Sequence, residues 1–581
     1  VYVSQSGSLV LLKDENNDDK ADSKEVLLSG FDDHDTHHAI SAFCADPSGA
    51  FIMCEGVFLH SNVETAYGPQ RGTNGGFFRY SPQRKQLTRH TQFSIPNPWG
   101  VAYDAYGQDF FLHTSGTSVS WMTPGTVRAR YGHNMRAPDL LTGNKVRPTS
   151  GIEFVSSRHF PDEVQGDIVL CNAIGYLGAK QHQLIEDGTG FTSRHRQDLF
   201  VSSDRNFRPT DLEFAPDGSL YVIDWHNVLI GHMQHNARDP HRDHVHGRIY
   251  RVTYPSRPLV TPAKIAGARI GELLENLKLP EARTRYRTRR ELRGRDADQV
   301  VAAAKAWTAG LPAGSERLKL EALWVTWGAD QVDEPLLREA LAAKDHRVRA
   351  AAVRVLRYNS HRIADQRDLL LMAANDDHGR VRLEAITAAS HLEKASGMPI
   401  LEAAKAKGLD KYSQQSFDFA YGVLNDIAVH PEVVEVIAPR HLKGVEAKRY
   451  VQGAAIYERE GHCGTCHQVD GQGLPDAGFP PVAGTKWVNG DVERLLKITL
   501  KGLHGPITVK GKAYPGFVPM TSFEKLLNDR EIAAVLTYVR NSFGNKASAV
   551  SPDQVKATRK AADGQEGFYD PAKLLKEHPH N

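Results

Sequence analysis

The pentapeptide Cys463-Gly-Thr-Cys-His467 constrains this chain more than any other feature. In c-type haem attachment, two thiols at this spacing add to the vinyl groups of one haem, and the adjacent His lies beneath the iron as proximal ligand. A thioredoxin-like redox pair shares part of the pattern. Half of a zinc site does too, but no second ligand pair stands at a suitable spacing. The motif therefore predicts covalent haem c bound by Cys463, Cys466 and His467.

A haem iron with a proximal His needs a sixth ligand or an open position. The chain has 7 Met, and only Met520 lies after residue 398. It follows a Pro/Gly-rich loop that begins at Tyr514. Ligation by a thioether raises the iron potential and favours electron transfer. We expect Met520 to be the second axial ligand, with His504 as the rival.

The neighbouring segments favour an all-α class I cytochrome c over residues 445–545. A helix over Ala447–Tyr457 would enter the Cys motif. The segment Phe479–Gly484 resembles the loop whose backbone carbonyl accepts the N–H of the proximal imidazole. Asp529–Phe543 has apolar residues at helical spacing, and its Tyr538 is expected to pack against Gly453 of the first helix.

Length and charge limit the remaining possibilities. At 581 residues the chain is long enough for three or four domains. The formal net charge of +2 excludes a polyanion binder driven by bulk charge, so we expect no nucleic-acid partner. No apolar run of roughly 18 residues occurs, so we expect no transmembrane segment in this chain. Residues 546–581 are charged and are expected to form a partly ordered tail that wraps the haem domain.

The middle of the chain, residues 265–440, carries a helical repeat. Similar segments begin at Arg289, Lys319, Arg349 and Arg382, and Asp345 and Asp377 stand before the last two as N-cap candidates. A period of ~30–40 residues built from helix pairs is typical of a HEAT-like solenoid. We expect it to act as a spacer or to dock the haem domain.

Residues 1–258 have the pattern of a β-propeller. Short apolar runs follow turn signals such as Ala45–Gly49, Tyr103–Gly107 and Ala215–Gly218. A polar cluster precedes each blade unit at intervals of roughly 50–60 residues. Only about four units are visible, and closed propellers usually have more, which suggests additional sequence ahead of Val1.

The polar clusters are expected to converge at one mouth of the propeller channel, where a substrate could bind. A His is suited to accept a hydroxyl proton, because imidazole titrates near neutral pH. An Arg could stabilise developing negative charge. Structural contacts between blades are the alternative for each single residue. The candidate catalytic residues are His38, His226, His244, Arg147, Arg208 and Asp211.

An acidic loop near the N-terminus has the spacing of an EF-hand calcium loop. Oxygen ligands stand at loop positions 1, 3, 5, 9 and 12, and a backbone carbonyl at position 7 completes the set. Position 6 is Asp19 in place of the usual Gly. A structural calcium ion is the functional interpretation, and an acidic hairpin turn is the alternative. The ligands would be Asp14, Asn16, Asp18, Lys20, Asp22 and Glu25.

Several stretches resemble the PVC-type haem-binding Cys-x-x-Cys-His proteins of planctomycetes, verrucomicrobia and their relatives. They are Thr36–Ala39, Glu55–His60, Asn97–Gly100, Asp224–His235 and Arg242–Arg248. The order of propeller, HEAT-like repeats and cytochrome c also matches. The resemblance implies a dehydrogenase-type propeller, similar to soluble glucose and sorbosone dehydrogenases, which use pyrroloquinoline quinone and calcium. It also implies a sugar or alcohol substrate and a periplasmic or cell-surface location.

Two functions from different classes follow. In the first, the propeller of a periplasmic oxidoreductase oxidises a sugar or alcohol hydroxyl and passes electrons through a His/Met haem c to an external redox protein. In the second, the protein is a non-enzymatic electron-transfer cytochrome whose propeller and solenoid bind proteins or glycans. Because c-type haem is attached outside the cytoplasm, Cys44 and Cys54 are either a disulfide or two buried free thiols. Cys171 lies in an apolar run and is expected to be a packed thiol.

Overall fold

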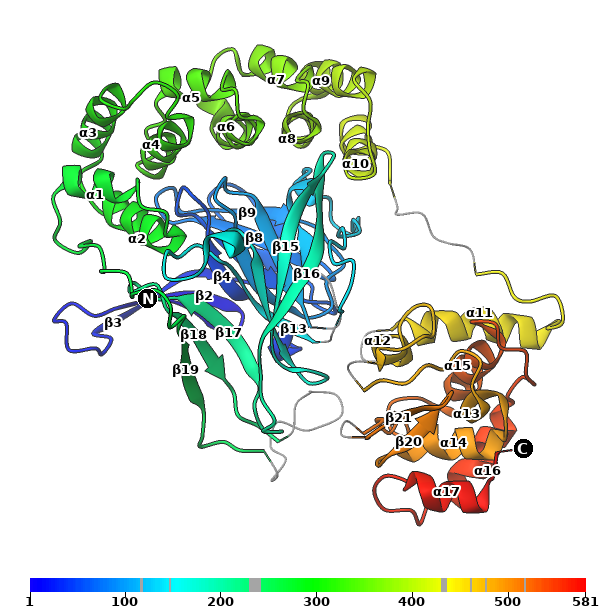
Figure 1. The fold of residues 1–581 in the computed structure, drawn as a ribbon. Helices are drawn as coiled ribbons and strands as arrows, with labels where there is room; N and C mark the ends of the chain where they lie inside the picture. Colours follow the sequence, from blue (N-terminus) through cyan, green and yellow to red (C-terminus); the bar gives the residue numbers. More distant parts are fainter. Residues whose placement is uncertain are drawn as a thin grey trace.

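The computed structural model has three parts in chain order: a region of β-sheets, a helical middle and a C-terminal domain (Figure 1). This order of a β-sheet part, a helical part and a C-terminal domain is the one expected from the sequence. The structure describes residues 1–114, 119–145, 148–228, 242–429, 436–459, 462–475, 478–516 and 519–580.

The N-terminal part consists of antiparallel sheets that follow one another along the chain. Its strands are β1 (Tyr2–Gln5), β2 (Ser8–Lys13), β3 (Ser23–Ser29), β4 (Ser41–Ala45), β5 (Phe51–Glu55), β6 (Asn62–Val63), β7 (Gln70–Arg71), β8 (Gly76–Ser81), β9 (Gln86–Thr91), β10 (Pro98–Tyr103), β11 (Asp109–His113), β12 (Val119–Trp121), β13 (Thr149–Phe154), β14 (Ile168–Ala173), β15 (Leu177–Asp187), β16 (Gly190–Val201), β17 (Pro209–Phe214), β18 (Leu220–Asp224) and β19 (Arg248–Val252). The sheet orders are β1-β2-β3, β4-β5-β8-β9, β10-β11-β12, β13-β14-β15-β16 and β17-β18-β19, and β6 pairs with β7. The first strands of four sheets are neighbours, because β10 contacts both β4 and β13, and β13 contacts β17.

The predicted turns join the first and second strands of three sheets. Gly49, Gly107 and Gly218 each end such a turn with a positive φ of 85°, 74° and 81°. Glycine has no Cβ, so it takes this conformation at little cost. The sheet β1-β2-β3 was not among the units counted from the sequence.

The helical middle forms an arc over the sheets (Figure 1). Its helices are α1 (Ile270–Asn276), α2 (Ala282–Arg293), α3 (Ala297–Ala309), α4 (Glu316–Gly328), α5 (Glu334–Leu341), α6 (His346–Asn359), α7 (Gln366–Ala374), α8 (Gly379–Ala389), α9 (Lys394–Ala406) and α10 (Ser413–Asn425). The four repeated segments lie on alternate helices, α2, α4, α6 and α8. Asp345 caps α6 as expected. The N-cap of α8 is His378, one residue after the predicted Asp377, and its ring accepts the Arg380 N–H.

The helical arc and the sheets share one apolar core and a buried polar network. Arg354 of α6 donates to Thr123 Oγ1 at 2.9 Å and pairs with Glu384. Asp109 accepts hydrogen bonds from His90 and Thr123 at 3.0 and 2.9 Å. Burial alone would raise the pKa of Asp109, but these bonds and the Arg354 charge lower it to about 2. Asp109 is therefore ionised inside the seam between the two parts.

The C-terminal domain is mostly helical. Its elements are α11 (Val445–Tyr457), α12 (Cys463–His467), α13 (Lys486–Asn489), α14 (Val492–Lys501), β20 (Ile507–Val509), β21 (Lys512–Tyr514), α15 (Asp529–Asn541), α16 (Pro552–Ala561) and α17 (Pro571–Glu577). The prediction of an all-α domain was wrong in one detail, because β20 and β21 form a hairpin. Helices α11 and α15 cross at Gly453, where an added Cβ would lie 2.0 Å from the Ala534 carbonyl oxygen and 2.8 Å from Tyr538 Cβ.

Residues 546–580 contain two capped helices rather than a partly ordered tail. Ser551 caps α16, and Asp570 caps α17. The buried Arg494 of α14 donates to the backbone oxygens of His578 and Pro579 at 2.7 and 2.9 Å. The end of this segment is thus held by hydrogen bonds from one guanidinium, while Val550, Val555 and Leu574 are buried in the apolar clusters of the domain.

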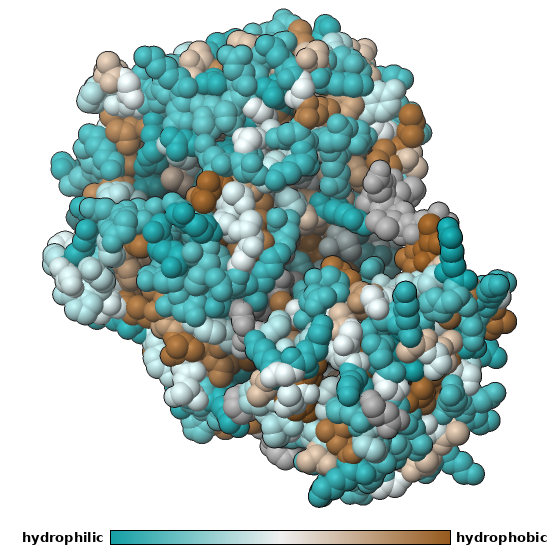
Figure 2. All heavy atoms as spheres, turned by 45° about the vertical axis from the view of Figure 1, so that its right-hand side comes forward, coloured by the Kyte–Doolittle hydropathy of each residue, from teal (hydrophilic) through white to brown (hydrophobic). Residues whose placement is uncertain are grey.

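The surface facing the viewer in Figure 2 is mainly hydrophilic, with apolar side chains in small scattered groups. Among the helices of the described residues, none combines the length and apolarity that crossing a bilayer requires.

Candidate functional site

The haem motif occupies the short helix α12, which places both thiols and His467 on one turn of chain. Cys463 and Cys466 are free thiols and half-buried. Cys463 packs against the core of the C-terminal domain, and burial raises the pKa of its thiol to about 12. Two thiols that are not joined in a disulfide, beside a half-buried imidazole, suit the two thioether bonds and the iron bond of a covalently attached haem.

A single hydrogen bond orients His467. Its Nδ1 donates to the Pro480 carbonyl at 2.8 Å, so Nε2 carries the lone pair that an iron would accept. Burial lowers the pKa of His467, which keeps the ring neutral. The expectation that Phe479–Gly484 supplies the carbonyl for the proximal imidazole is confirmed.

Met520 is held in a short backbone bridge. Its N–H donates to the Leu503 carbonyl at 2.8 Å, and the Leu503 N–H donates to the Met520 carbonyl at 3.1 Å. The neighbouring His504 donates its backbone N–H to the Tyr569 carbonyl at 3.0 Å, and its ring lies 6.1 Å from that of Phe568. Which of the two is the sixth ligand stays a prediction in favour of Met520.

The polar clusters that precede the first strands of neighbouring sheets contact one another in pairs. His37 Nε2 and His38 Nε2 lie 3.0 and 2.8 Å from Asn97 Oδ1. Ser150 Oγ donates to the Pro209 carbonyl at 3.1 Å. We call the edge where β4, β10, β13 and β17 begin the mouth of the sheets. Its opposite end is covered by α2, from which Arg283 donates to Glu153 at 2.6 Å.

Arg208 directly precedes β17 at the mouth, and Asp211 lies on this strand near the mouth. The buried Arg208 guanidinium donates to the backbone oxygens of Asn227 and Ala173 at 2.9 and 2.8 Å. These bonds favour a structural role over stabilisation of a substrate charge. Asp211 faces Gly151 across the strands, with its Oδ1 within 2.8 Å of where a Cβ at Gly151 would lie. Desolvation by the surrounding protein raises the pKa of Asp211. The hydrogen bond from the Leu212 N–H lowers it, but by less.

His226 stands just beyond β18, with an unusual φ of 47°. Its N–H donates to Asp224 Oδ1 at 2.7 Å, and its Nδ1 lies 2.6 Å from Arg248 Nη1. Asp224 Oδ1 also accepts the Arg208 N–H at 2.7 Å. The other oxygen of Asp224 is buried, has no hydrogen-bond partner among the described residues, and lies 3.8 Å from Arg248 Nη1. Asp224 therefore links His226 to Arg208. Asp224 is not among the catalytic residues expected from the sequence.

The other predicted histidine site is less compact. His244 is exposed, and both His244 and His246 lie before β19, so the two do not share the face of a strand. The His246 N–H instead donates to Asp243. Arg147 falls outside the described residues, so its predicted role stays open.

The acidic loop joins β2 to β3. Asp14 accepts the N–H groups of Asn17 and Asp19 at 2.7 and 3.0 Å, and Asp19 takes the left-handed φ of 64° that position 6 requires. Asp22 accepts the Glu15 N–H at 2.7 Å. Glu25, expected to close the site, lies on β3 and pairs with Lys13 at 3.2 Å. The predicted calcium set of Asp14, Asn16, Asp18, Lys20, Asp22 and Glu25 thus remains untested as a whole.

The remaining cysteines are free thiols. Cys44 lies opposite Ile52, and Cys54 lies opposite Ser41, so the strand register offsets the two residues. Of the two alternatives for Cys44 and Cys54, a disulfide or two free thiols, the structure therefore has the free thiols. Cys171 is buried on β14, as expected for a packed thiol.

Comparison with known proteins separates the two ends of the chain. Residues 450–543 match the family model for cytochrome c. Cytochrome c-552 of Thermus thermophilus is 38% identical over 141 residues, a match that covers 90% of that protein and 20% of this chain. The chain belongs to the cytochrome c family through its C-terminal domain. Covalent haem c is the cofactor of that family.

Other relatives of the cytochrome c domain are parts of dehydrogenases. The fructose dehydrogenase cytochrome subunit of Gluconobacter japonicus is 34% identical over 108 residues, or 18% of this chain. The quinone alcohol dehydrogenase cytochrome c subunit of Gluconacetobacter polyoxogenes is 35% identical over 97 residues, or 17% of this chain. The chain spans 22% and 20% of the lengths of these two subunits.

The sheets match a different family. Residues 1–256 match a domain of unknown function, DUF7133. Among solved structures, a luciferin-regenerating enzyme aligns with a TM-score of 0.31 at 14% identity, covering 45% of this chain and 76% of its own. A glucose dehydrogenase aligns with a TM-score of 0.26 at 12% identity, covering 42% and 73%.

The cytochrome c domain contacts the sheets beside the haem motif. Phe479 is buried, and Cys466 and Leu474 of its own domain pack against it. From the sheets, Ile174 and Tyr176 pack against the same ring. These two residues directly follow β14, whose last carbonyl, Ala173, accepts from Arg208 at the mouth. One thiol that would hold the haem is thus linked to the mouth through a short series of packed residues.

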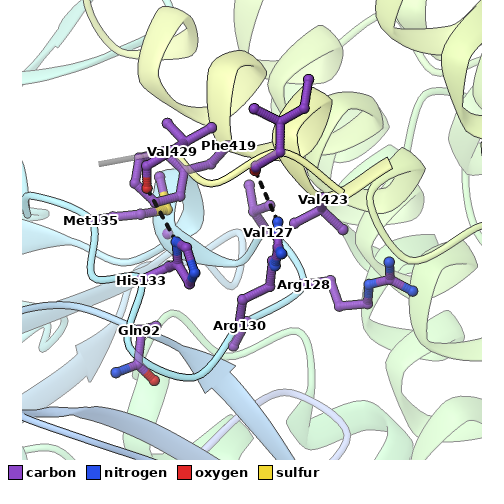
Figure 3. A pocket seen from close by; sticks show the side chains of 12 residues that line it. Gln92, Val127, Arg128, Arg130, His133, Met135, Phe419, Val423 and Val429 are labelled. Atoms are coloured by element: carbon purple, nitrogen blue, oxygen red, sulfur yellow. Dashed lines mark hydrogen bonds between the residues drawn. The ribbon is translucent and has the colours of Figure 1, made fainter. Parts of the chain in front are cut away.

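A separate hollow lies between the sheets and α10 (Figure 3). Arg130 crosses it and donates to the Ile427 carbonyl at 2.9 Å, and His133 lies 3.4 Å from the Val429 carbonyl. The lining is otherwise mainly apolar, with Phe419 and Val423 from the helix. Because these polar groups are engaged with the backbone of the helical part, we assign the hollow to the seam and not to a reaction site.

Proposed function

We propose that this protein is a cytochrome-linked dehydrogenase in which the mouth of the sheets oxidises a sugar or alcohol hydroxyl and the cytochrome c domain carries the electrons away. The observation that carries the proposal is the contact of Phe479 with Ile174 and Tyr176. Electron transfer weakens steeply with distance, so a donor at the mouth needs the haem domain seated beside it. The dehydrogenase-type cytochrome relatives support this class of reaction.

The architecture fits the same proposal. We interpret the sheets with neighbouring first strands as blades of a propeller, and the arc of helix pairs as HEAT-like repeats. Together with the C-terminal haem domain, this is the order found in the PVC-type haem-binding proteins. A periplasmic location is part of the proposal, because c-type haem is attached outside the cytoplasm.

Cys463, Cys466 and His467 would hold the haem, with Met520 as the sixth ligand. The haem would supply a one-electron redox centre, and its axial ligands would set the reduction potential. The chain's own contribution is to fix His467 through the Pro480 carbonyl and to pack Cys466 against Phe479, which also contacts the sheets. Oxidation of an alcohol to a carbonyl releases two electrons and two protons, so a two-electron acceptor such as a quinone would be needed at the mouth to take both electrons from the substrate. It would pass them singly to the haem, and the external redox protein would reoxidise the haem between the two transfers.

The direct test is haem reduction by substrate. Holoprotein with oxidised haem would be mixed with a panel of sugars and alcohols, with and without added pyrroloquinoline quinone and calcium, and followed by stopped-flow absorbance. The proposal predicts reduction by at least one member of the panel. In Tyr176→Ala the reduction rate should fall by about tenfold or more, because the contact with Phe479 is lost.

Tyr221→Ala is the matched control, since Tyr221 is an exposed tyrosine on β18, away from this contact. It should reduce its haem at the rate of the original protein. If no compound reduces the haem, the dehydrogenase proposal fails. The alternative would then hold, in which the sheets and helices bind a protein or glycan and the haem exchanges electrons with another redox protein.

A further inference from the structure

The imidazole of His226 at the mouth is held by one guanidinium. Its Nδ1 lies 2.6 Å from Nη1 of Arg248, the first residue of β19. An arginine side chain has only N–H donors, so His226 Nδ1 accepts this bond. A ring that accepts at Nδ1 is neutral and carries its hydrogen on Nε2. This tautomer is the opposite of that of the proximal His467, whose Nδ1 donates to a carbonyl.

The carboxylate of Asp224 fixes where this ring stands. Asp224 Oδ1 accepts the backbone N–H groups of His226 and Arg208, each at 2.7 Å. His226 has a φ of 47°, a left-handed conformation that residues other than glycine seldom adopt. Such a backbone persists where its surroundings impose it, and it is frequent at binding and catalytic sites. Asp224 Oδ2 lies 3.9 Å from His226 Nδ1, beyond hydrogen-bond distance, so it does not compete with Arg248 for that nitrogen.

The other ring nitrogen is open to a ligand. Among the described residues, no group is hydrogen-bonded to His226 Nε2, and 13% of the side chain is exposed. The ring also lies near the cytochrome c domain, because Arg208 donates to the Ala173 carbonyl and the next residue, Ile174, packs against Phe479. The mouth therefore offers an N–H donor on the side where the haem domain is seated.

We propose that the Nε2–H group of His226 binds an oxygen atom of the substrate, with Arg248 and Asp224 as positioning residues. The inference rests on the proposed function and names what the ligand must present there, a lone-pair oxygen such as that of a hydroxyl or of the carbonyl formed from it. A fixed donor binds such an oxygen more strongly as it gains negative charge. The sequence predicted a proton acceptor at His226, but the open nitrogen has no lone pair for a proton.

The tautomer can be measured without substrate. Holoprotein with reduced haem and isotope-labelled histidine ring nitrogens would be studied by NMR, and the signals that disappear in His226→Gln identify the ring. The inference predicts a hydrogen on Nε2 and none on Nδ1. A hydrogen on Nδ1 would overturn it, whatever the haem reduction assay shows.

Haem reduction by substrate tests the donor. His226→Gln keeps an N–H group near the position of Nε2, but an amide does not accept a hydroxyl proton. Removal of one donor to a charged oxygen slows a reaction by roughly 100-fold. His226→Leu should therefore be slowed about 100-fold, and His226→Gln by about tenfold or less. Equal losses in the two variants would overturn the inference, whereas no reduction in the original protein would remove the proposed function itself.

Arg248→Met tests the positioning residue. It should slow haem reduction by about tenfold in the original protein and have no further effect in His226→Leu, because Arg248 acts through the imidazole. Arg251→Met is the matched control, since Arg251 lies on the same strand, is 41% exposed against 42% for Arg248, and pairs with Asp217. It should keep the original rate. An effect of Arg248→Met that is equal in both backgrounds would show a structural role and overturn the assignment of Arg248.

Discussion

The proximal histidine shows how one hydrogen bond prepares a residue for its ligand. The bond from His467 Nδ1 to the Pro480 carbonyl fixes both the tautomer and the ring plane before any metal binds. The buried His38 at the mouth is oriented in the same way, because its Nδ1 donates to the Val57 carbonyl at 2.9 Å. In both places a backbone carbonyl decides which nitrogen faces inward.

Replacement of the sixth ligand is the first prediction. Met520→Ala should lower the reduction potential of the haem on the order of 0.1 V, within the roughly 0.8 V range that axial ligands span. It should also allow added imidazole to bind the iron. Spectroelectrochemical titration measures both effects. His504→Ala should leave the potential unchanged, and the reverse pattern would make His504 the ligand.

At the scale of elements, the crossing of α11 and α15 depends on the absence of one side chain. Gly453→Ala should destabilise the cytochrome c domain by about 1–3 kcal/mol, because its Cβ would press on the Ala534 carbonyl. Thermal unfolding followed by haem absorbance would measure the loss. Gly564→Ala is the control, since nothing lies within 4 Å of a Cβ there. Equal stability of the two variants would contradict the packing.

The seam between the sheets and the helices gives a pH-dependent prediction. Asp109 has its pKa lowered from 3.8 to about 2 in the folded protein. Its ionised form contributes about 2 kcal/mol to the free energy of unfolding above pH 4, and this contribution is lost as the pH falls through 2. The stability difference between the original protein and Asp109→Asn should therefore shrink between pH 6 and pH 2.5 in urea unfolding followed by tryptophan fluorescence.

The control for this prediction is Asp426→Asn. Asp426 also pairs with an arginine, Arg130, but its side chain is 94% exposed. A solvent-exposed pair contributes little, so the effect should stay below about 1 kcal/mol at either pH. A difference for Asp109→Asn that is constant with pH would show that its carboxylate is not the source.

At the scale of the whole molecule, what could be predicted depended on how local the signal was. Short stretches of sequence were enough to predict the haem motif, the turns ending at Gly49 and Gly107, and the alternate helices of the repeat. The carbonyl partner of His467 lies only 13 residues away. By contrast, the link between His37 and Asn97 spans 60 residues, and the contact of Phe479 with Tyr176 joins separate domains.

The predictions that missed did so for the same reason. Asp224 has no motif of its own, and only the fold brings its carboxylate to the Arg208 N–H. The end of the chain after α17 is held by Arg494, a charged residue whose hydrogen bonds to backbone oxygens no apolar pattern shows. A period-2 or helical pattern reports burial, but it does not report which polar groups meet.

Phe479 and Pro480 are consecutive residues with different structural roles. The first packs against the sheets, and the carbonyl of the second holds the ligand of the iron. Separation of the domains would therefore alter the hydrogen bond that sets the basicity of His467. If the docked and separated forms have different reduction potentials, thermodynamic reciprocity requires that adding an electron changes the docking equilibrium by the same free energy. Reduction of the haem would then itself change the affinity of the cytochrome c domain for the sheets.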